Sequence, residues 1–262
     1  MLKHLVLSVD YTADWELAVS QLPVLIKRLG TEKLTLMYII ETHKRQHMED
    51  NEGSVAGKLK AMAEELSTRL GIVADYKVGR GFVASKILEL AKLAHADGVI
   101  ACNRSHSQGR ELFLGNNAMN LARMTLLPLL ILPVDGSPAT DYAPVLLATD
   151  GSDTSSRATA CFEELVGNGS EGLVVWVRPE EDSEQVDGVD HQVHELANRY
   201  SNVHAEILGG HPAEGILETI HNTKPVLTVL GKRGNTPIPD ILLGSVSQRV
   251  ARNSNSPVLL IP

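Results

Sequence analysis

The sequence predicts an α/β protein built from two tandem copies of one doubly wound unit, each with a parallel five-stranded sheet. Three observations support this fold: the two halves of the chain repeat each other, each half alternates apolar runs with helical patterns, and the apolar runs are continuous. The run Pro225–Leu230 (PVLTVL), for example, has no polar face. Such a run is typical of a parallel strand that helices cover on both sides. We expect the strand order 3-2-1-4-5 in each copy.

The internal repeat is clearest at the two ends of each copy. Residues 127–133 (LPLLILP) align with residues 256–262 (SPVLLIP), and residues 4–10 (HLVLSVD) align with residues 144–150 (PVLLATD). A turn-rich stretch separates the copies. We therefore expect a first domain at residues 1–133, a linker at residues 134–142 and a second domain at residues 143–262.

The elements of the second copy can be placed in order along the chain. Between its predicted strands, periodic segments predict helices, so strands and helices alternate. Alternation with right-handed crossovers gives a doubly wound sheet. The strands are expected at 144–149, 173–178, 203–208, 226–230 and 257–261, and the helices near 153–166, 186–200, 212–222 and 245–254.

Composition and charge exclude several classes of function. No apolar run approaches the ~20 residues of a membrane-spanning helix, and the N-terminal apolar stretch is too short for a secretory signal. Two cysteines cannot form a disulfide framework, so we expect a reduced, cytoplasmic protein. Residues 1–142 balance in charge, and residues 143–262 account for the whole formal charge of −8. A surface of that sign repels a phosphate backbone, which argues against nucleic-acid binding.

A ligand crevice is expected beyond the carboxyl ends of the strands, where the winding reverses between the first and fourth strands. In the second copy the first strand ends at Asp150, the fourth ends at residues 231–234 (GKRG), and residues 244–247 (GSVS) open a helix. Glycines let the backbone approach a ligand, a helix start favours phosphate, and Lys232 or Arg233 could add charge. The spacing alone leaves a second interpretation open: the glycines are turns and Ser245 is an N-cap.

The spacing Gly231-x2-Gly234-x9-Gly244-Ser245, between a strand and a helix, resembles the ATP-binding signature of universal stress proteins. The resemblance covers both copies. It implies the Rossmann-like fold of the adenine-nucleotide alpha hydrolases, ATP with or without Mg²⁺ as ligand, and a stress-response role as a nucleotide-dependent regulator or sensor. It places Asp150 and Val177 on the adenine and ribose side. The residues that it assigns to the ribose and phosphates are Gly231, Arg233, Gly234, Gly244, Ser245, Val246 and Ser247.

The resemblance also implies an assembly. In the family the final strands of two domains pair across a pseudo-two-fold axis, and strands 128–132 and 257–261 could do so within this chain as an intramolecular pseudo-dimer. Such pairing would protect two sheet edges. Further homodimerisation stays open, and the sequence names no protein partner.

The first copy departs from the signature. Cys102, Ser105 and Asn116 stand where the second copy has Gly231, Gly234 and Ser245, although Asp10 and Gly115 match Asp150 and Gly244. Side chains at both former glycines would crowd the loop. We therefore expect one nucleotide per chain, in the second copy.

Other patterns suggest no catalytic group and no metal site. His191 and His194 have helical spacing that two metal ligands could use, but a solvated helix face is the preferred interpretation. Cys102 is interpreted as a small buried hydrophobe in preference to a redox-sensitive thiol. Two rival functions remain. One is an interaction scaffold that binds no nucleotide. The other is an adenylyl-transfer enzyme, because residues 150–156 (DGSDTSS) loosely resemble the phosphate loop of such enzymes. Any ATP hydrolysis should be slow.

Overall fold

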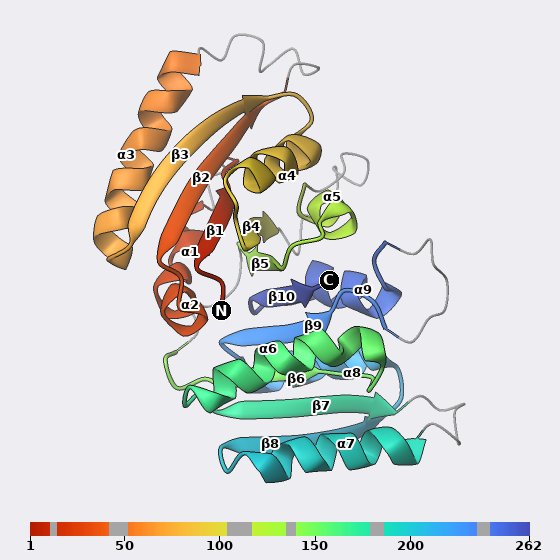
Figure 1. Ribbon diagram of the computed structural model, residues 1–262. Helices are drawn as coiled ribbons and strands as arrows, with labels where there is room; N and C mark the ends of the chain where they lie inside the picture. Colours follow the sequence, from red (N-terminus) through yellow and green to blue (C-terminus); the bar gives the residue numbers. More distant parts are fainter. Residues whose placement is uncertain (11–14, 42–51, 104–116, 135–139, 179–185, 235–241) are drawn as a thin grey trace.

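The computed structural model of the chain describes residues 1–10, 15–41, 52–103, 117–134, 140–178, 186–234 and 242–262 (Figure 1). Within these ranges ten strands form one sheet in the order β3-β2-β1-β4-β5-β10-β9-β6-β7-β8. Each half therefore keeps the expected order 3-2-1-4-5. The predicted linker lies mostly outside the described residues, because residues 135–139 fall in a gap.

The first half alternates strands and helices from its N-terminus. Its second helix has a proline in the first turn and ends at Gly30, which adopts the left-handed conformation that favours glycine. Its elements are β1 (His4–Ser8), α1 (Trp15–Val19), α2 (Leu22–Leu29), β2 (Lys33–Ile40), α3 (Glu52–Leu70), β3 (Val73–Arg80), α4 (Val83–Leu93), β4 (Gly98–Asn103), α5 (Asn117–Met124) and β5 (Leu129–Pro133).

The second half repeats this alternation. Each strand predicted for it is present, and each end lies within one residue of the predicted position, because buried parallel strands are continuous apolar runs. The elements are β6 (Val145–Ala148), the 3₁₀ turn Asp153–Ser155, α6 (Ser156–Gly167), β7 (Gly172–Arg178), α7 (Val186–Arg199), β8 (Val203–Gly209), α8 (Pro212–Thr223), β9 (Leu227–Gly231), α9 (Ser245–Asn253) and β10 (Val258–Ile261).

The two predicted five-stranded sheets are joined into one sheet, because their final strands pair with each other within the chain. β10 pairs antiparallel with β5, and Leu259 lies opposite Leu130 at the centre of the seam. The other neighbouring strands run parallel. The final strands therefore meet as the pseudo-dimer arrangement requires, and neither remains an open edge.

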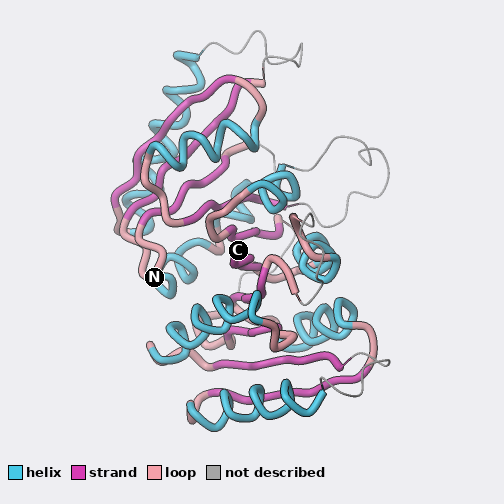
Figure 2. The backbone as a smooth tube through the Cα atoms, turned by 45° about the vertical axis from the view of Figure 1, so that its right-hand side comes forward, coloured by secondary structure: helices cyan, strands magenta, loops and turns pink. Residues whose placement is uncertain are grey.

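Helices cover both faces of the sheet, as Figure 2 shows with cyan helices on either side of the magenta strands. Alternate residues of a strand point to opposite faces, so Leu5 and Leu7 join one apolar cluster and Val6 joins the other. α2, α3, α6 and α7 supply the first cluster, and α4, α5, α8 and α9 supply the second. Among the described residues, no helix combines the length and apolar character that a membrane crossing needs.

Candidate functional site

The loops after β6 and β9 meet at the carboxyl edge of the sheet, as the sequence predicts. The closest approach is between Asp150 and Gly234: a Cβ added at Gly234 would lie 2.3 Å from the Asp150 Oδ2 atom. Any side chain at position 234 would displace this carboxylate. Gly234 does not have the positive φ of a glycine turn. A glycine at this position instead leaves room for the Asp150 carboxylate beside the loop.

Gly231 is also enclosed, but by backbone atoms. A Cβ at this position would lie 2.9 Å from the Arg233 carbonyl oxygen, 3.3 Å from the Ser155 Cα and 3.4 Å from the Thr154 carbonyl oxygen. Backbone atoms cannot move aside as the end of a side chain can. The loop after β9 thus packs against the start of α6 so closely that only glycine fits.

Hydroxyl groups fasten the two loops together. The Ser152 backbone N–H and hydroxyl donate to Asp150 Oδ1 at 3.1 and 2.6 Å, which fixes one oxygen of the carboxylate. The Thr154 hydroxyl lies 3.2 Å from the Gly234 carbonyl oxygen and donates to it across the crevice. The spacing of the glycine loop did not single out Ser152 and Thr154. The signal that could have found them is the row of hydroxyl residues directly after Asp150.

Helix α9 begins beside this loop without a side-chain cap. Gly244 is its N-cap residue, in an extended conformation, and no side chain of the described residues caps the helix. The interpretation of Ser245 as the N-cap is therefore wrong: Ser245 is the first helical residue, and it is exposed. The N–H groups of the first turn and the helix dipole together favour an anion at this end.

Ser247 and Val246 lie differently from Ser245. Ser247 is buried, and its hydroxyl donates to the Gly231 carbonyl oxygen at 2.7 Å. This hydroxyl holds the glycine loop against α9. Val246 is half-buried and packs against the apolar cluster that α8 and α9 share.

The two basic residues of the loop point in different directions. Arg233 is exposed beside the crevice, whereas Lys232 is 6% exposed and its Nζ lies at the C-terminal end of α5 in the other half. Burial, and then the charge of Arg233, lower the pKa of Lys232 to about 8. Of the two, only Arg233 is placed to add positive charge to the crevice.

Val177 is not brought to the surface of the crevice. It is 4% exposed and packs on α8, where a Cβ added at Gly215 would lie 2.9 Å from its Cγ2 atom. The residue after it, Arg178, lies with its guanidinium 5.6 Å from the Trp176 ring centre and pairs with Asp190 of α7. The structure thus gathers the predicted residues from the two loops and the start of α9, with Val177 in the core below.

The first half has part of an equivalent site within the described residues. Asp10 is exposed after β1, and Cys102 lies near the end of β4, where burial and the charge of Asp10 raise the pKa of its thiol to about 12. A thiol with a raised pKa is mostly protonated at neutral pH. Cys102 is half-buried and packs against the first apolar cluster. Ser105, Gly115 and Asn116 lie outside the described residues.

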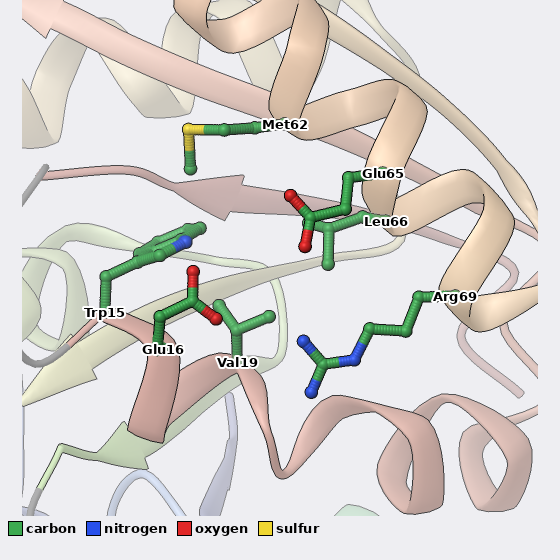
Figure 3. A pocket seen from close by; sticks show the side chains of 7 residues that line it. All are labelled: Trp15, Glu16, Val19, Met62, Glu65, Leu66 and Arg69. Carbon is green, nitrogen blue, oxygen red and sulfur yellow. The ribbon is translucent and has the colours of Figure 1, made fainter.

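Two hollows outside the crevice occupy equivalent places in the two halves. The first, of about 190 Å³, lies between α1 and α3, and Glu65 and Arg69 extend into it from α3 (Figure 3). The second, of about 360 Å³, lies between α6 and α7, where Glu195 and Arg199 repeat that spacing. It shares the loop after β6 with the crevice, but the glycine loop does not line it.

The two histidines on α7 do not form a metal centre with other described groups. His191 and His194 are both exposed. In the part of the chain that the structure describes, no set of three or more His, Cys, Asp or Glu side chains is placed to hold a metal ion. The edge where the loops after β6 and β9 meet the start of α9, by contrast, carries N–H donors, a cationic side chain, hydroxyls and one carboxylate. This combination suits a ligand that has both an anionic group and hydroxyl groups.

Comparison with known proteins gives a consistent result over the whole chain. The profile of the universal stress protein family matches residues 1–140 and again residues 141–262. A universal stress protein of Mycolicibacterium smegmatis is 28% identical over 219 residues, which covers 77% of this chain and 73% of that protein. Universal stress protein MJ0531 of Methanocaldococcus jannaschii is 31% identical over 142 residues, covering 46% of this chain and 82% of that protein.

A solved structure has the same fold over nearly the full length. The crystal structure of a universal stress protein from Archaeoglobus fulgidus superposes with a TM-score of 0.78, and it covers 98% of this chain and 95% of that one. The sequence identity is 21%, so this likeness supports the fold.

Proposed function

Since the chain belongs to the universal stress protein family over both of its halves, we propose that it binds one ATP molecule in the crevice of its C-terminal half. The ligand would lie over the edge of the sheet where the loop after β6, the glycine loop 231–234 and the start of α9 meet. Its adenine and ribose would lie on the Asp150 side. Its phosphates would lie against Gly231, Gly234, Gly244 and the first turn of α9.

The observation that carries this proposal is the contact between the Asp150 carboxylate and Gly234 beside an uncapped helix. Two segments that are far apart in sequence approach until no Cβ fits between them. The first N–H groups of α9 then face the same edge without a side-chain cap. Backbone N–H groups at a helix start, approached through glycines, are a common way to hold phosphate oxygens.

Binding would depend on local groups, because the C-terminal half carries the whole net charge of −8. The exposed Arg233 and the α9 dipole supply positive potential at the crevice. Mg²⁺ would enter with the phosphates, since this ion keeps most of its coordination to water and phosphate oxygens in nucleotide sites.

The restriction to one half follows from the space around Gly231. The residue at the equivalent position of the first half is Cys102. A Cβ in the place of Gly231 would lie 2.9 Å from a backbone carbonyl oxygen, so a cysteine there cannot support the same loop. The N-terminal half would act as a structural partner of the C-terminal half. Nucleotide bound in the C-terminal half would regulate which proteins the chain contacts in the stress response.

A thermal melt tests nucleotide binding. We expect 1 mM Mg-ATP to raise the melting temperature by several degrees, because a site with a Kd of about 10 µM gains roughly 2.7 kcal/mol at a hundredfold ligand excess. Gly231→Val should abolish the shift. Gly57→Ala is the matched control, because a Cβ at Gly57 meets nothing within 4 Å.

The second variant needed is Arg233→Ala, which changes an exposed side chain and should leave the fold intact. It should reduce the ATP-induced shift and leave the melting temperature without ligand unchanged. If wild-type protein shown to be free of nucleotide gives no shift, the proposal is wrong, and the ligand-free scaffold becomes the better account.

A further inference from the structure

The Lys232 side chain points away from the candidate site and contacts the N-terminal half of the protein. It stands between Gly231 and Arg233, yet its Nζ donates to the carbonyl oxygens of Arg123 at 2.9 Å and Thr125 at 2.7 Å. Both acceptors lie at the C-terminal end of α5, where the last carbonyl groups of a helix lack intrahelical partners. An ammonium group is favoured at this negative end of the helix dipole.

The first half makes the reciprocal contact. Asn103 ends β4 as Lys232 follows β9, and the alignment of the two halves places these residues at equivalent positions. Its Nδ2 donates to the carbonyl oxygens of Ala251 at 3.2 Å and Arg252 at 3.1 Å, at the C-terminal end of α9. Asn103 is 1% exposed and Lys232 is 6% exposed, so both contacts are buried.

These contacts surround the seam between the two halves. β5 and β10 pair there, and Arg123 of α5 donates to the Gln248 side chain of α9 at 3.0 Å. We call the two reciprocal contacts the crossed clamps: the Lys232 clamp on α5 and the Asn103 clamp on α9. Each half thus caps the last helix of the other.

Only the Lys232 clamp is continuous with the candidate site. The Lys232 N–H donates to the Ile261 carbonyl oxygen of β10 at 2.6 Å, and its own carbonyl accepts the Gly244 N–H at 3.0 Å. One residue therefore contacts the seam strand, the N-cap of α9 and the far end of α5. The Asn103 clamp lies at the opposite end of α9: its acceptors, Ala251 and Arg252, are seven and eight residues after Gly244, or about 11–12 Å along the helix.

We propose that Lys232 is a positioning residue that ties the glycine loop of the C-terminal half to helix α5 of the N-terminal half, so that nucleotide occupancy and the seam are coupled. The inference rests on the proposed function, because the coupling needs a nucleotide in the crevice. The coupling gives the N-terminal half a role in nucleotide binding, although that half lacks the glycine signature itself. Its helix α5 holds the loop that the ligand contacts. Nucleotide binding at the glycine loop would in turn affect α5 through the Lys232 side chain.

Paired variants test this coupling. We expect Lys232→Met to raise the Kd for Mg-ATP about tenfold in calorimetric titration, and Lys232→Arg to restore it to within about threefold, because arginine keeps a charged donor. Asn103→Ala is the matched control: it removes the other clamp, and its Kd should stay within about twofold of wild type. The two clamp deletions should lower the melting temperature by similar amounts.

Hydrogen exchange provides a readout that a merely structural role would not move. Mg-ATP should slow amide exchange in α5, residues 117–124, in wild type and in Asn103→Ala, but not in Lys232→Met. If Lys232→Met binds as tightly as Asn103→Ala, or if α5 is protected equally in all three proteins, the coupling is refuted and nucleotide binding stands. If wild type binds no nucleotide, the proposed function fails and the coupling fails with it. If Lys232→Met does not fold, the arginine variant decides: loss of α5 protection despite a retained donor refutes the proposal.

Discussion

Gly231→Ala should destabilise the protein far more than Gly234→Ala, although both add one methyl group to the same loop. At position 231 the new Cβ would lie 2.9 Å from a backbone oxygen, with two more backbone atoms at 3.3 and 3.4 Å. The main chain must shift, and overpacking of this kind costs about 2 kcal/mol. At position 234 the atom in the way is the end of the Asp150 side chain, which can rotate. Asp150 is half-exposed, so water can replace its two hydrogen bonds to Ser152, and we expect a net cost of about 1 kcal/mol.

Urea unfolding followed by circular dichroism measures both values. For a chain of this size 2 kcal/mol corresponds to a fall of roughly 4–8 °C in melting temperature. Gly57→Ala should be neutral or stabilising, because it adds helix propensity at an exposed position. The reasoning is refuted if Gly231→Ala matches Gly57→Ala, or if Gly234→Ala is the more damaging of the two loop changes.

Three further predictions concern Ser247, Lys232 and the two half-buried cysteines. Ser247→Ala should lower the unfolding free energy by about 1–2 kcal/mol in urea, because the buried Gly231 carbonyl loses its hydroxyl donor at 2.7 Å. Ser245→Ala, at an exposed position, should change it by less than about 0.5 kcal/mol. Equal effects of the two variants would contradict this reasoning. The pKa of Lys232 is lowered to about 8, so between pH 8 and the ordinary lysine pKa the unfolded chain binds more protons than the folded one. The unfolding free energy of wild type should therefore rise with pH in this range, relative to that of Lys232→Met. A difference between the two proteins that stays flat or falls with pH would contradict the lowered pKa. Cys102 and Cys161, whose thiol pKa values burial raises to about 12, should resist iodoacetamide at neutral pH in the folded protein and react after denaturation, as mass spectrometry would show; rapid labelling of native protein would contradict this.

Much of the fold could be predicted because buried parallel strands leave a simple pattern. β9 is a continuous apolar run with no polar face, so its position followed from the residues alone. The joined sheet could not be derived this way, since an apolar final strand is equally suited to pairing within the chain and to pairing with a second copy. The choice depends on how the halves dock, and sequence periodicity does not record that.

The sequence predicted which loops meet at the candidate site, but not the contacts between them. The glycines at 231 and 234 were found by spacing, but the reason for them lies in atoms of the loop after β6, which belong to another part of the sequence. Lys232 and Arg233 are neighbours with the same charge, and only the packing shows that one of them crosses the seam. The hydroxyl of Ser247 was expected at the ligand, whereas in the structure it donates to the glycine loop.

Isothermal titration of the nucleotide-free protein with Mg-ATP tests the central claim most directly. The glycine loop of the C-terminal half, and the cysteine at the equivalent position of the N-terminal half, lead us to expect one ATP per chain and no heat of binding in Gly231→Val. Two equivalents per chain, or unchanged binding in Gly231→Val, would contradict this account.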